Sequence, residues 1–527
     1  MGNNMGNAKK YYPYLLWMVC FFIVISPMFS GGIWAGFDWQ AHTLRFTALK
    51  HSLEHSQIPP TFDYWTDTQY AYPWQIFYAP LSSIYFIFSI LTLHGFSSET
   101  QLKFSIMLIM LTGALTSFFV GKKYHQDTDS GIFVSILFIS TGYVLSNVYI
   151  RFSLGELLAV SLTPLFIYGV ICLFKNTNGK WWLTISSILI ALSNIPLFIC
   201  SFVFFVIITL TNLKKVASLN HIKFYTYSLI LFAGATCFYW LPLAYQSSMT
   251  GIYAFTGLKN SYVYMHQVSA EVIDVLLPIT TSSGSSVGKI LCINTVSLII
   301  CMYLFFCKKT NSTENKLFLA SIIAVFAATN LFPWFLIPES FPVLGAIQFP
   351  WRMIGLSIFG LCLISGKLAS NNKYILWILI ALSMTQAFHP LKKASNEEFK
   401  FQNSMLYIDY MNKTASLEGL NYLKQRENRM KLISQKPEKF SNGYPVFFNK
   451  SEKSLTLPFL WYYGYYIKVN GNTKPVEQDE HGLVKVDNLP SNSVIEIKYD
   501  TWLINLSYII SFLTIILFVA FRIKAPK

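Results

Sequence analysis

The chain has 527 residues, of which 53% are hydrophobic and only 12% are charged. Because soluble globular domains are about 25% charged, this composition excludes an ordinary soluble protein and predicts that most of the chain lies in a lipid bilayer. The net charge of +15 does not indicate nucleic-acid binding, since an excess of lysine in a multi-pass membrane protein marks the cytoplasmic side and contacts anionic headgroups. The eight cysteines fall in apolar segments without C-x-x-C spacing, which favours small core residues over disulfides or a metal site.

A transmembrane helix needs about 20 apolar residues, and twelve segments approach that length. Seven lysine pairs flank these segments, and all seven fall on one side of the membrane if the apolar stretch 77–93 stays in the first outer loop. The positive-inside rule therefore predicts a polytopic α-helical membrane protein of about twelve transmembrane helices with both termini cytoplasmic. The predicted spans are 14–34, 104–121, 131–149, 157–174, 182–196, 198–212, 224–245, 290–307, 317–334, 353–369, 374–388 and 503–521.

The first outer loop, 35–103, is rich in ionisable groups although the chain around it is almost uncharged. It opens with G-F-D-W-Q-A-H-T-L-R-F, in which Asp38, His42 and Arg45 have the spacing i, i+4 and i+7. In a helix these three side chains share one face. A carboxylate in that setting suits removal of a proton from a hydroxyl, so Asp38 is the predicted general base, although Asp before a helix is also a common N-cap.

Other polar and aromatic loop residues carry weaker signals. His42 is expected to orient Asp38, to contact a donor substrate or to ligate a metal. Asp38 with His42 and His51 with His55 have the i, i+4 spacing of metal ligands, but such pairs are common by chance, so a divalent metal is possible without being supported. Asp63 and Asp67 of P-P-T-F-D-Y-W-T-D read as solvated loop residues. Sugars stack on aromatic rings, so Tyr72 is a candidate sugar contact. Membrane interfaces also attract aromatic residues, which is the alternative explanation. His266 in the outer loop 246–289 is another candidate.

Three of the six arginines, Arg45, Arg151 and Arg352, fall at the predicted outer boundary of the membrane. A charge near lipid is costly unless it is paired or hydrated, and the planar guanidinium matches phosphate oxygens in pairs. These arginines therefore predict a pocket for a lipid-linked phosphate. The alternative is that each arginine pairs with a nearby carboxylate or headgroup.

The second outer link reads N-V-Y-I-R-F-S-L-G-E and ends at Glu156. An arginine and a glutamate around a glycine between two spans predict a second site carboxylate or an acceptor ligand at Glu156. A glutamate in the first turn of a helix is also favoured by the helix dipole alone.

The polar stretch 390–500 follows the eleventh span. Its second half alternates apolar and polar residues, broken by N-G and G-N pairs, which is typical of β-hairpins. We predict three parts: a transmembrane module over 1–389, an extracytoplasmic domain over 390–500 that is mostly β in its second half, and a final transmembrane helix with a cytoplasmic tail over 501–527.

At these motifs the chain resembles a known family. The pattern F-D-W-x-x-H-x-x-R, then P-P, then Y-P-W-x-x-F-Y-x-P-L is similar to the first outer loop of bacterial GT-C-type membrane glycosyltransferases, among them YfhO-like proteins and those labelled 6-pyruvoyl-tetrahydropterin-synthase-related membrane proteins. R-F-S-L-G-E resembles their R-G-x-x-G-E stretch, with Phe152 where a glycine is usual. Q-F-P-W-R at 348–352 and L-P-F-L-W-Y-Y-G-Y-Y at 457–466 resemble later landmarks.

This resemblance implies a GT-C-like fold in a bacterial cell membrane, a polyprenyl-phosphate sugar as donor, an active site on the outer face and Asp38 as base. The expected acceptor is an envelope glycan or a teichoic-acid-like polymer. No P-loop, dinucleotide fingerprint, H-E-x-x-H or G-x-S-x-G occurs in the sequence, so no cofactor is expected and the donor must supply the energy. The rival functions are a transporter or flippase of lipid-linked sugars and a non-catalytic envelope-assembly protein.

Overall fold

A computed structural model describes the chain apart from a few short stretches, and it divides into two compact units. The first contains residues 1–42, 92–232 and 260–401, and the second contains residues 43–91, 233–259 and 402–527. The stretches outside the described part are 1, 35, 67–69, 212, 214–218, 253–261, 278–290, 370–372, 397–406, 408, 416–418, 426, 429–434 and 525–527. The predicted loop residue Asp67 lies outside the described residues.

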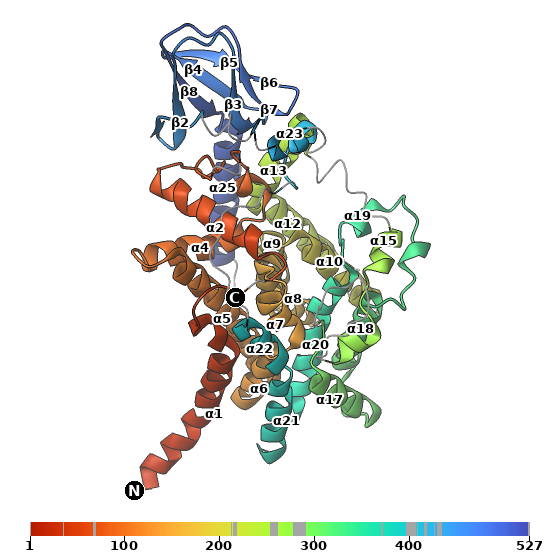
Figure 1. Cartoon of the computed structure of the whole chain (residues 1–527). Coiled ribbons are helices and arrows are strands. Elements are labelled where there is room, and N and C mark those ends of the chain that lie inside the picture. Colours follow the sequence, from red (N-terminus) through yellow and green to blue (C-terminus); the bar gives the residue numbers. More distant parts are fainter. Residues whose placement is uncertain are drawn as a thin grey trace. The chain divides into compact units, whose positions relative to one another are not determined.

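The first unit is helical throughout its described part (Figure 1). Helix α8 forms its centre, with every residue from Leu154 to Ile167 buried, and packs against α5, α9 and α20. The helices are α1 (Gly2–Ile25), α5 (Ser98–His125), α6 (Thr128–Ile139), α7 (Gly142–Tyr149), α8 (Leu154–Phe174), α9 (Trp181–Ala191), α10 (Ile195–Leu210), α12 (Leu219–Ala235), α15 (Tyr262–Gln267), α16 (Val272–Leu276), α17 (Thr295–Phe306), α18 (Ser312–Ala328), α19 (Pro342–Gly345), α20 (Ile354–Ser365), α21 (Lys373–Thr385) and α22 (Phe388–Asn396), with the short 3-10 turn η5 (Pro350–Met353) before α20.

Among the described residues, five helices are long and apolar enough to cross a membrane, or seven if each of two bent pairs is one span. The chain is therefore a mostly helical membrane protein, as predicted. The number twelve is not reached by length alone, because other predicted spans fall on shorter helices such as α10 and α17. The five are Tyr11–Phe29, Ser98–His125, Leu154–Phe174, Pro350–Leu368 and Trp502–Arg522.

The apolar stretch 77–93 forms the end of α3 (Trp74–Phe77) and then α4 (Leu81–Thr92). The 12 residues of α4 rise about 18 Å, whereas the hydrocarbon core is about 30 Å thick. By length, α4 does not qualify as a complete span.

The predicted span 131–149 is bent by 50° between α6 and α7. A break frees backbone groups that lipid cannot satisfy, and buried side chains satisfy them here. The amide of Asn294 donates to the carbonyl of Leu137 at 2.8 Å, and the hydroxyl of Thr141 donates to the same carbonyl at 2.9 Å. The second break, of 64°, separates α12 from α13 (Cys237–Gln246).

The second unit contains the small C-terminal β region that the sequence predicts (Figure 1). A five-stranded sheet has the order β1-β2-β8-β4-β5 and a three-stranded sheet has the order β3-β7-β6, with every pair antiparallel. The Asn470-Gly471 pair turns β4 into β5 with positive φ at both residues, as N-G turns require. The strands are β1 (Lys439–Ser441), β2 (Tyr444–Asn449), β3 (Leu455–Leu460), β4 (Tyr465–Val469), β5 (Asn472–Pro475), β6 (Glu477–Gln478), β7 (Leu483–Val486) and β8 (Ser493–Tyr499).

Most of the first outer loop belongs to this second unit. Helix α2 (Trp39–Glu54) crosses the boundary after His42, and the chain beyond it bonds to the β region. The N–H of Leu460 in β3 donates to the carbonyl of Tyr70 at 2.8 Å, and the hydroxyls of Tyr64 and Tyr465 lie 3.1 Å apart. The compact unit is thus built from three sequence segments, whereas the sequence predicted a domain from 390–500 alone.

The last helix, α25 (Trp502–Lys524), packs against α13 within the second unit. The hydroxyl of Ser511 accepts the N–H of Phe238 and donates to the carbonyl of Gly234, both at 2.9 Å. Thr514 fills the space beside Gly234, where a Cβ would lie 2.4 Å from its hydroxyl oxygen. Close helix contact at this small residue fixes the middle of α25 beside the end of α12 and the start of α13.

Candidate functional site

Two backbone hydrogen bonds join the first outer loop to the second outer link inside the first unit. The N–H of Phe37 donates to the carbonyl of Ile150 at 3.2 Å, and the N–H of Asp38 donates to the carbonyl of Arg151 at 2.9 Å. A Cβ on Gly36 would lie 2.5 Å from the Cβ of Phe152, so only glycine permits this approach. The structure therefore places Asp38 next to Arg151 although 113 positions separate them in the sequence.

The link itself turns sharply between α7 and α8. The N–H of Arg151 donates to the carbonyl of Ser146 at 2.7 Å, and the N–H of Ser153 donates to that of Asn147 at 2.8 Å. Phe152 has a φ of +56°, in the left-handed region that favours glycine. This conformation gives a physical reason why a glycine would suit the position.

Glu156, in the first turn of α8, is fully buried and makes four hydrogen bonds. Its Oε1 accepts from Nη1 of Arg151 at 2.6 Å and from the hydroxyl of Tyr143 at 2.5 Å. Its Oε2 accepts from Nη2 of Arg151 at 2.9 Å and from Nε of Arg352 at 3.0 Å. One carboxylate thus holds two guanidinium groups that lie 201 positions apart in the sequence.

Arg352 reaches Glu156 from η5, within the Q-F-P-W-R motif. Its Nη1 donates to the carbonyl of Ile347 at 2.7 Å and to Oε1 of Gln348 at 3.0 Å. Gln348 has a φ of +62°, which turns the chain so that both acceptors face the same guanidinium. The stacked rings of Phe349 and Trp351, with centroids 4.5 Å apart, close this side of the cluster.

The cluster carries an uncompensated positive charge before Asp38 is counted, since two guanidinium groups face one carboxylate. Burial alone would lower the pKa of Arg151, but the charge and hydrogen bonds of Glu156, with a contribution from Asp38, raise it above its ordinary value. Arg151 therefore stays charged. Within the described part of the chain, Nε of Arg151 and Nη2 of Arg352 make no hydrogen bond, so each arginine keeps N–H donors for an anion.

Asp38 and Glu156 differ in what their carboxylates are able to do. Asp38 is half-buried at the start of α2, where its backbone carbonyl accepts the first helical N–H, that of His42, at 3.1 Å. The oxygens of Glu156 are already occupied by four donors. The sequence predicts both as catalytic. The four donors suit Glu156 for holding Arg151 and Arg352 in place, and proton transfer by Asp38 stays a prediction.

His42 lies on the first turn of α2 and is 2% exposed. Its Nε2 accepts the N–H of Leu154 at 3.3 Å, which satisfies one free donor at the start of α8. The arrangement requires an unprotonated Nε2. His42 is therefore joined to the same link as Asp38, in the first unit.

Arg45 and Tyr72 lie in the second unit, in an aromatic environment of their own. The guanidinium of Arg45 is buried 3.4 Å from the ring centroid of Tyr78, and its Nη2 donates to the hydroxyl of Ser82 at 3.0 Å. Tyr72 is fully buried, and its hydroxyl accepts the N–H of Tyr410 at 2.7 Å. These contacts give both residues a packing role within that unit.

His266 lies on α15 in the first unit. Its Nδ1 is 3.3 Å from the carbonyl oxygen of Phe332, and its ring meets that of Phe335 at 4.9 Å. Its contacts within the described residues are with these loop positions and do not join it to Glu156. The described residues also contain no group of three or more potential metal ligands.

Sequence reasoning missed three residues of the cluster: Tyr143, Asn147 and Gln348. Tyr143 and Asn147 belong to an apolar span, where a single polar side chain gives little signal, although Asn147 accepts from Nη1 of Arg151 at 2.7 Å. Gln348 stands in the quoted Q-F-P-W-R motif. Its spacing of four residues from Arg352 was the sequence signal that could have linked the two side chains.

Asp63 is buried, with 1% exposed, and is not the solvated loop residue that the sequence predicts. Its Oδ1 accepts the N–H groups of Trp65 and Thr66, both at 3.2 Å. Burial raises the pKa of the Asp63 carboxyl and lowers the pKa of the nearby His51 imidazole. The ionised form of Asp63 therefore destabilises the folded state.

This raised pKa makes a prediction for stability against pH. The folded protein binds the Asp63 proton more tightly than the unfolded chain, so stability falls as the pH rises from about 4 through the folded-state pKa. Asp63→Asn keeps the accepting oxygen and removes the charge, so we expect its gain in Tm over the wild type to be larger at pH 7.5 than at pH 4. Loss of Asp63 also lowers the pKa of His51 further, which widens the difference in the same direction. Thermal unfolding in detergent at both pH values measures it, and an equal or reversed difference would contradict the buried, ionised Asp63.

Comparisons with known proteins leave the family open. No family model matches the chain. The chain is similar to an uncharacterised protein from Lactococcus lactis subsp. cremoris (strain MG1363), with 23% identity over 350 residues, which are 63% of this chain and 56% of that protein. The alignment thus spans little more than half of that relative. The resemblance to GT-C-type enzymes depends on the sequence motifs alone.

Proposed function

We propose that this protein is a GT-C-type membrane glycosyltransferase that moves a sugar from a polyprenyl-phosphate carrier to an envelope glycan or a teichoic-acid-like acceptor. The observation that carries the proposal is the position of Asp38. Asp38 is half-buried, its backbone N–H donates to the carbonyl of Arg151, and Glu156 fixes Arg151 and Arg352 together. A base next to two oriented guanidinium groups fits an acceptor hydroxyl on one side and a phosphate on the other.

In this mechanism Asp38 takes the proton of the acceptor hydroxyl. The hydroxyl oxygen then attacks the anomeric carbon, and the bond between that carbon and the phosphate oxygen breaks. The electron pair leaves with the polyprenyl phosphate, whose growing negative charge is stabilised by the remaining donors of Arg151 and Arg352. Direct displacement with one base inverts the configuration at the sugar carbon.

Glu156 acts in this scheme as a positioning residue. Its bidentate pair with Arg151 and its contact with Arg352 fix both guanidinium groups before the donor binds, so less ordering is required in the transition state. We do not include Arg45, Tyr72 or His266 in the reacting set, because their contacts lie elsewhere.

We also propose the membrane arrangement that the lysines favour. The chain crosses a bacterial cell membrane about twelve times, with both termini cytoplasmic and with Asp38 at the outer face. The short helices among the predicted spans would then cross at places where the bilayer is thinned or where neighbouring helices cover their ends.

A second function is favoured by the bent helix pairs. Helices broken within the membrane are characteristic of transporters, in which they line substrate sites, and two such pairs occur among the described residues. A flippase of lipid-linked sugars would use these breaks to pass the headgroup.

A transfer assay in proteoliposomes distinguishes the glycosyltransferase from the flippase. The purified protein is reconstituted with a radiolabelled polyprenyl-phosphate sugar and an acceptor glycan on one side of the bilayer. The proposal predicts label in the glycan. Label that crosses the bilayer on an unchanged lipid would support the flippase instead, and label that does neither would contradict both functions.

A further inference from the structure

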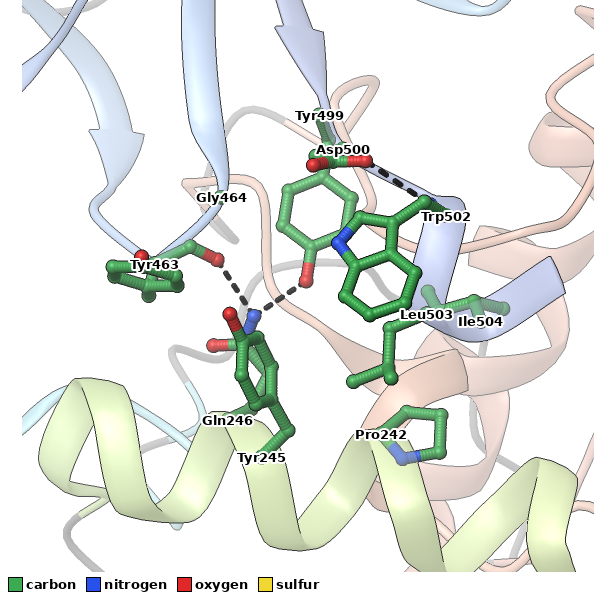
Figure 2. A pocket seen from close by; sticks show the side chains of 10 residues that line it. All are labelled: Pro242, Tyr245, Gln246, Tyr463, Gly464, Tyr499, Asp500, Trp502, Leu503 and Ile504. Carbon is green, nitrogen blue, oxygen red and sulfur yellow. Dashed lines mark hydrogen bonds between the residues drawn. The ribbon is translucent and has the colours of Figure 1, made fainter. Parts of the chain in front are cut away.

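The second unit contains an open pocket at the start of α25, far along the chain from Asp38. It lies between the end of α13, the loop between β3 and β4, and the end of β8 (Figure 2). The residues that shape it are Tyr245, Gln246, Tyr463, Tyr499, Asp500 and Trp502. Its cavity volume is only about 30 Å³, far below the roughly 300–1,000 Å³ usual for sites that enclose a small molecule. A ligand would therefore lie against the opening with one face and would not be enclosed by it.

A hydrogen-bond network around Gln246 fixes the pocket walls. Gln246 is 1% exposed, and its amide nitrogen donates to the carbonyl of Tyr463 at 2.7 Å and to the hydroxyl of Tyr499, as Figure 2 shows. The hydroxyl of Thr250 donates to the amide oxygen at 2.7 Å and accepts the N–H of Tyr463 at 3.1 Å. The walls are thus in position before any ligand arrives, which reduces the entropy lost on binding.

The pocket has aromatic faces on one side and a carboxylate at its rim. Trp502 is 55% exposed and lines the pocket together with Tyr499, while Tyr463 is 38% exposed and meets Tyr245 edge to face at 5.7 Å. Oδ1 of Asp500 accepts the N–H of Trp502 at 3.0 Å, and the N–H of Asp500 donates to the carbonyl of Gly464 at 2.9 Å. The carboxylate is therefore held in place at the rim.

The chemistry of these walls selects among ligand classes. The lining contains a carboxylate and no basic side chain, so a phosphate or another anion is disfavoured. Phenol and indole groups donate hydrogen bonds, whereas the carboxylate only accepts them. A sugar hydroxyl both donates and accepts, and the C–H face of a pyranose ring packs on an aromatic face. An ammonium group would use the carboxylate and the rings but not the donors.

We propose that this pocket binds one neutral sugar residue of an extracellular glycan. Trp502 supplies the stacking face, Asp500 accepts hydrogen bonds from ring hydroxyls, and Gln246 holds Tyr463 and Tyr499 in the binding conformation. Interfacial anchoring alone would explain exposed tyrosine and tryptophan, but it would not require the buried Gln246 network or the carboxylate. This binding does not depend on the proposed transfer reaction, but the extracellular side of the pocket rests on the proposed membrane arrangement.

Saturation-transfer NMR on the full-length protein in nanodiscs tests the inference. The probes are the methyl glycosides of glucose, galactose and N-acetylglucosamine, with phosphocholine and glycerol phosphate as comparison ligands. We expect saturation of at least one glycoside, and a Kd about tenfold weaker or more in Trp502→Ala, the size of effect typical for an aromatic residue at the centre of a site. Asp500→Asn keeps the oxygen that accepts the N–H of Trp502 and should weaken binding without disturbing α25.

Two variants serve as controls. Trp240→Ala removes an exposed tryptophan on α13, and Glu477→Gln removes an exposed carboxylate on β6. Neither residue lines the pocket, so both variants should bind the glycosides as the wild type does. Unchanged thermal unfolding shows that each variant is folded. Saturation of phosphocholine but not of any glycoside, glycoside binding that survives in both pocket variants, or no saturation of any probe would each overturn the proposal.

Discussion

Replacing Asp38 with asparagine is expected to reduce sugar transfer by roughly 10²–10⁴-fold, the usual contribution of a general base. Asparagine keeps the size and the backbone hydrogen bonds of the residue, including the one from its N–H to the carbonyl of Arg151 at 2.9 Å, but it cannot take up the proton of an acceptor hydroxyl. The protein should therefore insert into the membrane and unfold at the same temperature as the wild type. Transfer rates in proteoliposomes, compared at equal protein content, give the size of the effect.

The control for this experiment lies on the same helix. Glu54 is an exposed carboxylate in the last turn of α2, and Glu54→Gln makes the same chemical change without touching the link at Arg151. We expect that variant to transfer sugar at the wild-type rate. Near-normal transfer by Asp38→Asn, or equal losses in the two variants, would remove Asp38 from the mechanism.

The largest effect on stability is expected for Glu156→Gln. The substitution leaves two buried guanidinium groups without their counter-charge, and removing one partner of a buried ion pair typically costs about 3–5 kcal/mol. It also replaces a carboxylate oxygen by an amide NH₂ that would face the donors of Arg151 or Arg352. We expect much lower accumulation of folded protein and a reduced Tm, together with loss of transfer.

Glu314 provides the matched comparison. It is also a buried carboxylate of the first unit, 3% exposed, but its cationic partner Lys367 is partly exposed at 3.1 Å, so water replaces much of a lost charge. Glu314→Gln should therefore lower Tm less than Glu156→Gln does. If the two variants lost stability equally, Glu156 would not be the anchor of the arginine pair.

Much of the site was predictable because ionisable groups stand out in an apolar chain. Asp38, Arg151, Glu156 and Arg352 were each chosen because charge near lipid requires a reason, and the structure brings all four into one unit. What the sequence could not show is how the oxygens of Glu156 are occupied. That depends on Tyr143, whose neighbours in the sequence are apolar.

Arg45 shows a limit of helical spacing as a guide. The i+7 spacing from Asp38 predicts a shared face, but the helix crosses from one unit to the other after His42. The surroundings of Arg45 come from Tyr78, Tyr239 and Tyr410, which lie in three distant segments of the second unit. A pattern confined to one helix carries no information about such partners.

How much of the fold could be predicted also depends on whether the signal is local or non-local in the sequence. Apolar length predicted a helix in each proposed span, and the N-G pair at 470–471 predicted a hairpin, because both signals are local. The bends of 50° and 64° depend on packing around breaks such as Ser140, and the union of residues 43–91 with the β region depends on contacts such as that of Leu460 with Tyr70. Those contacts are not visible in a single sequence.

The most direct test follows the sugar carbon itself. A polyprenyl-phosphate donor labelled with ¹³C at the anomeric carbon is supplied to the wild type and to Asp38→Asn in proteoliposomes, and the glycan product is read by NMR. The proposed reaction predicts a labelled product of inverted configuration from the wild type and none from the variant. A product of retained configuration, equal product from both proteins, or a donor recovered intact from both would contradict a glycosyl transfer that depends on Asp38.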